Sequence, residues 1–169
     1  MKKILTLVLF LGIVSAISGL VLGYVNSVTE PLIQEAAIKA EKANLELMYP
    51  GADFTPVGDK YVDGSTILGI YEADGQGYIF KLWGKGYSSS GITILVGFDY
   101  DGTIQKLVPL EQQETNGFGA ENFKDDAINS LYIGKTLDQD VDLRSGSTVT
   151  SKAMQGMIAA AKAVFPELG

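Results

Sequence analysis

The segment Gly91-Ile92-Thr93-Ile94-Leu95-Val96-Gly97-Phe98 decides the fold, because it is the most apolar run outside the N-terminal region. Its isoleucine, threonine and valine residues are β-branched, and such residues favour strands. A run this apolar is typical of a strand inside a sheet. We therefore expect residues 91–98 to form a central strand.

Three further β-rich runs surround this strand, at residues 65–72, 77–83 and 103–109. Asp74-Gly75 separates two of these runs, and Asp101-Gly102 follows the central strand. Asp-Gly is a strong hairpin signal, because its residues tolerate the left-handed backbone of a tight turn. The sequence therefore predicts an antiparallel meander.

Two helices are expected after the strands, over Ala120–Leu131 and Ser151–Phe165. The second candidate carries apolar residues at helical spacing, namely Ala153, Met154, Met157, Ile158, Ala161 and Phe165. Strands followed by helices predict an α+β domain, with the helices covering one face of the sheet.

The N-terminal region contains 22 uncharged residues, Ile4 to Val25. At about 1.5 Å per residue, a helix of this length spans roughly 33 Å and matches a bilayer core. Lys2 and Lys3 precede it, so we expect a cytoplasmic N-terminus and an extracytoplasmic domain. A cleaved signal peptide, with small residues near Ser15, is the alternative.

A second helix is predicted to link this span to the domain. Thr29 suits an N-cap and Pro31 suits a first turn, and apolar residues recur at helical spacing to Leu47. The expected division is a membrane anchor at 1–25, a juxtamembrane helix at 26–50 and a domain at 51–169. The juxtamembrane helix could also be a mere stalk.

Composition excludes several kinds of chemistry. The chain has no cysteine and no histidine, so iron–sulfur clusters, haem and Ser-His triads are excluded and no metal site is expected. A redox role would need an organic cofactor. Residues 26–169 carry 11 basic and 20 acidic residues, a net charge of −9, so no nucleic-acid partner is expected.

The segment 142–151 is a hydroxyl-rich loop that leads into the last predicted helix. Free N–H groups and the helix dipole favour a phosphate at such a position. The alternative is that Thr150 or Ser151 simply caps the helix.

Asp142-x-x-Ser145-Gly146-Ser147-Thr148 resembles the Asp-x-x-(Ser/Thr)-Gly-Ala-Thr motif of FMN-binding domains. In that family a flavin transferase joins FMN through its phosphate to the threonine, so the resemblance implies a phosphoester on Thr148. It also implies cofactor contacts from the neighbouring residues Ser145, Gly146, Ser147, Val149 and Thr150. Ser147 replaces the usual alanine, and we expect its added hydroxyl to be exposed and tolerated.

A second segment, Glu114-Thr115-Asn116-Gly117-Phe118-Gly119, resembles the family's Glu-Thr-Pro-Gly-Leu-Gly. Asn116 replaces proline and Phe118 replaces leucine. The resemblance places this loop beside the flavin ring and implies contacts from Glu114, Thr115, Gly117 and Phe118. An ordinary glycine-rich turn is the alternative.

Trp83, the only tryptophan, precedes Gly84-Lys85-Gly86-Tyr87, which is similar to a Lys-Gly-Tyr pattern of the family. We include Trp83 among the candidate cofactor contacts, although core packing is the commoner role of a single tryptophan.

The combination of one N-terminal span, the Thr-x-Pro helix entry and both motifs resembles the G subunit of the Rnf electron-transport complex. The related C subunit of the sodium-translocating NADH:quinone reductase is longer. The resemblance implies an electron-transfer subunit of a ferredoxin:NAD oxidoreductase that transports sodium or protons, with no active site of its own. Expected partners are the other membrane subunits, the flavin transferase and membrane lipid. The alternatives are a stand-alone extracytoplasmic flavoprotein reductase and a noncatalytic membrane-tethered assembly module.

Overall fold

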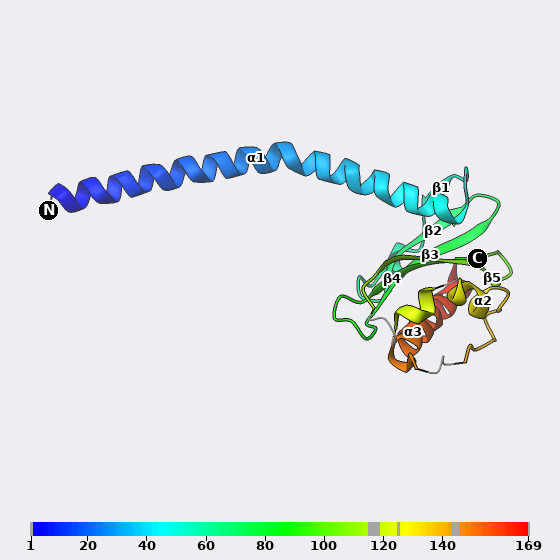
Figure 1. Ribbon diagram of the computed structural model, residues 1–169. Helices are drawn as coiled ribbons and strands as arrows, with labels where there is room; N and C mark the ends of the chain where they lie inside the picture. The colour runs from blue at the N-terminus through cyan, green and yellow to red at the C-terminus, as the bar shows by residue number, and fades with distance from the viewer. Residues whose placement is uncertain (1, 115–118, 125, 143–145, 169) are drawn as a thin grey trace. The chain divides into compact units, whose positions relative to one another are not determined.

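The computed structural model describes residues 2–114, 119–124, 126–142 and 146–168. The chain divides into two compact units, Met1–Lys42 and Ala43–Gly169. The first unit consists of most of one helix, α1 (Lys2–Met48). The second unit contains the end of α1, the sheet and the other helices (Figure 1).

Helix α1 is long and apolar enough to cross a membrane over Thr6–Met48, with a mean hydropathy of 2.3 in its most apolar window. At about 1.5 Å per residue, these 43 residues extend roughly 65 Å, about twice the thickness of a bilayer core. Only part of α1 can therefore lie in hydrocarbon. An apolar helix near the N-terminus is also found in signal sequences, so that alternative stays open, as does the division at residues 25 and 50.

The structure has one continuous helix where the sequence predicted a new helix start near Thr29. The Thr29 hydroxyl donates to the Val25 carbonyl at 2.7 Å, so it bonds within the helix and does not cap one. Pro31 also lies inside α1. Proline removes one backbone donor, but its fixed φ is close to the helical value. The helix can therefore continue through this point.

The last turn of α1 belongs to the core of the domain. Leu45 and Met48 are 4% and 3% exposed, and they pack with Ala73, Ile79 and Leu95. Leu47, which the helical spacing had singled out, is 52% exposed. This end of the helix is therefore more than a stalk, because it covers one face of the sheet.

The sheet is a five-stranded antiparallel meander in the order β1-β2-β3-β4-β5. Its strands are β1 (Phe54–Pro56), β2 (Ile67–Ala73), β3 (Gly77–Gly84), β4 (Ile92–Phe98) and β5 (Ile104–Gln112). The predicted meander is confirmed, with strand ends shifted by up to three residues. The edge strand β1 was missed, because three residues ending in proline show no strand pattern.

Both predicted hairpin turns are present. Gly75 and Gly102 have φ values of 71° and 79°, in the left-handed region that glycine adopts without strain. The Asp99 carboxylate accepts the N–H group of Thr103 at 2.8 Å and so closes the second turn. These turns set the register of two strand pairs, β2 with β3 and β4 with β5.

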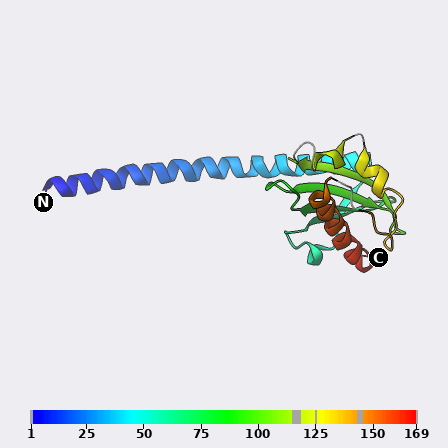
Figure 2. The same ribbon diagram turned by 60° about the horizontal axis from the view of Figure 1, so that its bottom comes forward.

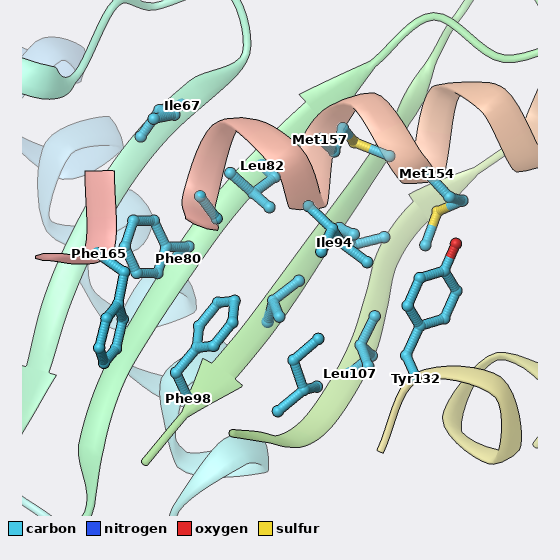
Figure 3. Close-up of a cluster of buried hydrophobic side chains, with 14 of the residues drawn as sticks. Ile67, Phe80, Leu82, Ile94, Phe98, Leu107, Tyr132, Met154, Met157 and Phe165 are labelled. Atoms are coloured by element: carbon cyan, nitrogen blue, oxygen red, sulfur yellow. The ribbon is translucent and has the colours of Figure 1, made fainter. Parts of the chain in front are cut away.

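Strand β4 is buried on both faces, as its sequence predicted. On one face, Ile94 and Phe98 join a core with Met154 and Met157 of the last helix (Figure 3). On the other face, Leu95 packs with the end of α1. Its position between two apolar layers explains why β4 lacks the alternation of a half-exposed strand.

The helices after the sheet differ from the prediction at their ends. The expected helix 120–131 is divided into a 3-10 turn, η2 (Ala120–Phe123), and α2 (Ala127–Tyr132). Asp126, with φ 60°, precedes α2, and a regular helix cannot contain this backbone conformation.

The last helix, α3 (Thr148–Val164), is followed by η3 (Phe165–Glu167). It starts three residues before the predicted Ser151. Helices α2 and α3 cover the same face of the sheet (Figures 1 and 2), which confirms the α+β arrangement.

The packing of α1 on the sheet predicts different costs for two neighbouring leucines. Leu45→Ala should lower the free energy of unfolding by about 2–5 kcal/mol, because it leaves a cavity in a buried cluster. Leu47→Ala, at an exposed position of the same turn, should change it by about 0.5 kcal/mol or less. Denaturant unfolding of the full chain measures both, and equal costs would contradict the packing of this turn.

Candidate functional site

The site is built around the N-terminus of α3. Ser147 is the N-cap residue, but its side chain makes no capping hydrogen bond. Its hydroxyl instead donates to Oδ1 of Asn122 at 3.3 Å. The first backbone N–H groups of α3 are therefore left without a cap from this side chain, at the positive end of the helix dipole.

One alternative and one expectation about this loop were wrong. Thr150 and Ser151 do not cap the helix, because α3 begins at Thr148 and both lie inside it, where they are buried. Ser147, expected to be exposed, is 5% exposed. The Ser147 side chain is buried because its hydroxyl donates to Asn122 of η2.

Thr148 is the first residue of α3, and it is exposed. It lies at a pocket of about 240 Å³. The lining residues come from the start of α3 and from two loops, and they are Tyr87, Gly119, Gly146, Ser147, Thr148, Val149 and Thr150. Sites for drug-sized ligands usually measure about 300–1,000 Å³, so this pocket can cover only part of a flavin nucleotide.

The structure brings five of the candidate residues together, because the whole segment from Gly146 to Thr150 lines this one pocket. Gly146 has φ 82°, which lets the chain turn into the helix. Thr115, Gly117, Phe118 and Ser145 lie outside the described residues. Their assignment as cofactor contacts stays a prediction.

Glu114 lies behind the pocket rather than in its wall. Its side chain is 8% exposed. Oε2 accepts the N–H group of Tyr87 at 3.2 Å, and Oε1 accepts that of Ser88 at 3.0 Å. The hydroxyl of Thr150 also donates to Oε2. The carboxylate is thus bonded to residues that line the pocket, although its predicted contact with the flavin stays untested.

Trp83 lies against Gly91 and is not among the residues that line the pocket. It follows Leu82, whose side chain belongs to the core beneath α3, and successive residues of a strand point to opposite faces. The indole lies against Gly91, where an added Cβ would come within 2.6 Å of it. This position gives no support for flavin contact, which remains a prediction.

Two residues of the site were missed. Tyr87 lines the pocket with a 55% exposed ring, and the Lys85-Gly86-Tyr87 pattern was the signal that could have identified it. Asn122 is buried and bonds both Ser147 and the Gly119 carbonyl. No sequence signal marked Asn122, because a polar residue in a predicted amphipathic helix is usually solvated.

A larger hollow of about 680 Å³ lies between α3 and residues 135–142. Lys135 and Lys162 line it together with Asp140 and Asp142, so its charges are balanced. Burial raises the pKa of Tyr132, at its wall, to about 12, so this phenol stays neutral. None of the candidate residues that the structure describes lines this hollow, whereas five of them line the smaller pocket at Thr148.

Comparison with known proteins bears directly on this pocket. Residues 86–163 match the FMN-binding domain family. This match confirms the resemblance found in the sequence. It begins at Gly86, next to the pocket residue Tyr87, and it includes β4, β5, α2 and nearly all of α3. The FMN-binding domain therefore contains the whole pocket.

Two relatives extend the similarity beyond the FMN-binding domain. One is the G subunit of the Na⁺-translocating ferredoxin:NAD⁺ oxidoreductase complex of Acetobacterium woodii, which is 25% identical over 90% of this chain and 87% of its own. The other is the G subunit of the proton-translocating ferredoxin:NAD⁺ oxidoreductase complex of Clostridium ljungdahlii, 24% identical over 85% and 82% of the two chains.

Side chains pack closely against Gly119 but not against Gly156, so alanine at these two positions should change the free energy of unfolding in opposite directions. Gly119→Ala should lower the free energy of unfolding by about 1–3 kcal/mol, because a Cβ there would overlap Glu114 and Thr150. Gly156→Ala should raise it by about 1 kcal/mol, because Gly156 is inside α3 with open space around it. Thermal unfolding measures both changes in stability. A Gly119→Ala variant as stable as wild type would contradict the close packing of Glu114 and Thr150 against Gly119.

Proposed function

We propose that this chain is the electron-transfer subunit of a membrane ferredoxin:NAD oxidoreductase, and that it carries FMN as a phosphate ester on Thr148. The position of Thr148 carries this proposal. Its hydroxyl is exposed at the first residue of a 17-residue helix, within a pocket of the FMN-binding domain. A phosphate on this oxygen would lie next to the first backbone N–H groups of α3, which the Ser147 side chain does not cap.

The residues of the pocket suit the parts of a flavin nucleotide. Tyr87 offers an aromatic ring and Val149 an apolar surface, and both are more than half exposed. Such side chains suit a flat ring, whereas the helix N-terminus suits the phosphate. Because the pocket measures only about 240 Å³, the described residues alone would cover only part of the cofactor noncovalently. A covalent bond would prevent its loss.

The attachment is a group transfer that needs an activated flavin donor and the flavin transferase. The bond that forms joins Oγ of Thr148 to the phosphorus of FMN. The bond that breaks joins this phosphorus to its leaving group on the donor, and the hydroxyl proton is lost. When bound, FMN supplies one- and two-electron chemistry, and the chain supplies position and electrostatics.

The partners follow from the two relatives. Both are named as subunits of multi-subunit complexes, so we propose that other membrane subunits exchange electrons with this chain. The relatives are named for different ions, sodium and protons, and the proposal therefore extends only to cation transport. In this proposal membrane lipid surrounds residues 4–25 of α1, and the domain faces the extracytoplasmic side.

Thr148→Val should abolish flavin attachment, because valine has nearly the same shape but no hydroxyl. Thr148→Ser should retain it, and Thr55→Val, at an exposed threonine of β1, is the control. Full-length protein coexpressed with a flavin transferase is denatured and weighed by intact mass spectrometry. An FMN-sized increment should occur in every protein except Thr148→Val. Unmodified wild type, or modified Thr148→Val, would overturn the proposal.

The orientation of the domain can be tested because the chain has no cysteine. Thr55→Cys on the domain should react with a membrane-impermeant maleimide in intact cells. Lys3→Cys, in the short N-terminal tail, should react only after the cells are lysed. The reverse pattern would place the domain in the cytoplasm.

A further inference from the structure

Glu114 is a buried carboxylate, and the hydrogen bonds that it accepts from described residues come from the surroundings of the pocket. Burying a carboxylate costs several kcal/mol unless donors replace its lost water. Here the replacement is the N–H groups of Tyr87 and Ser88, at 3.2 and 3.0 Å, and the hydroxyl of Thr150. These donors come from two segments that are more than sixty residues apart in the chain.

The backbone around Glu114 is shaped to admit its carboxylate. An added Cβ at Gly86 or at Gly119 would overlap the carboxylate oxygens. Glycine at both positions therefore lets two loops close over the side chain. The Gln112 side chain also accepts the N–H group of Glu114 at 3.0 Å, which fixes the start of the loop.

The first turn of α3 is thus held at two points. Thr150 donates to Glu114, and Ser147 donates to Asn122. Thr148 lies between these two anchored residues, and its own side chain is exposed. The backbone position of Thr148 is therefore set by its neighbours in the turn.

Tyr87 and Thr150 line the pocket from two different segments, and Glu114 accepts a hydrogen bond from each of them. We propose that Glu114 is a positioning residue, which rests on the function proposed above. It holds the Tyr87 loop and the first turn of α3 at a fixed separation. This separation presents Thr148 for flavin attachment and then fixes the surroundings of the attached ring.

The test uses the full-length chain in detergent, a purified flavin transferase and its flavin donor. The initial rate of attachment is followed by intact mass, and visible circular dichroism reports the surroundings of the attached flavin. Glu114→Gln removes the charge but keeps the shape. Thr150→Val removes the donor, Thr150→Ser retains it, and Glu111→Gln changes an exposed glutamate on β5 as the control.

Glu114→Gln and Thr150→Val should each slow attachment by about tenfold or more, because a hydrogen bond to a charged group is lost. Both should also change the visible circular dichroism of the attached flavin. Thr150→Ser and Glu111→Gln should match wild type in both measurements.

Wild-type rates and spectra in Thr150→Val, or a Thr150→Ser variant as defective as Thr150→Val, would overturn the positioning role. Thr150→Val and Thr150→Ser decide the matter even if Glu114→Gln fails to fold. Failure of wild type to accept flavin would instead count against the proposed function, so the two failures are distinguishable.

Discussion

The packing of α3 on the sheet is the constraint on which the site depends. Met154 and Met157 are buried against β3 and β4, and the side chain of Met157 lies so close to Gly84 that a Cβ there would overlap it. This apolar contact fixes the position of α3, but it does not by itself fix the first turn. The polar contacts of Ser147 and Thr150 do so. Hydrophobic burial thus places the helix, and hydrogen bonds orient the one residue proposed to carry the cofactor.

The negative charge of the chain explains why a covalent bond to the anionic FMN would be useful. Residues 26–169, which include the domain, carry a net charge of −9, so this part of the chain repels a free anion such as FMN. The positive end of α3 acts only over a short range, because the effect of the helix dipole falls off within the first turn. A phosphate ester would keep the anion at this position whatever the charge of the domain.

The sequence predicted the meander, the buried β4, both hairpin turns and the helix after the hydroxyl-rich loop, because each depends on local residue chemistry. The sequence was a poorer guide to the burial and contacts of side chains, because these depend on residues that are distant in the chain. Ser147 was expected to be exposed, but Asn122, 25 residues away, draws it inward. The burial of Leu45 in place of Leu47 depends on how the end of α1 meets the sheet. Glu114 was recognised from its motif, yet its contacts with Tyr87 and Thr150 become visible only in three dimensions.

The central claim is that one particular hydroxyl carries the flavin, and fragmentation of a single peptide tests it most directly. Trypsin cleaves after Arg144 and Lys152 and releases residues 145–152, which contain five hydroxyl side chains. Tandem mass spectrometry of this peptide from flavin-loaded protein should place the whole FMN phosphate on Thr148. A modified peptide with the flavin on Ser145, Ser147, Thr150 or Ser151, or the absence of any modified peptide, would contradict the account.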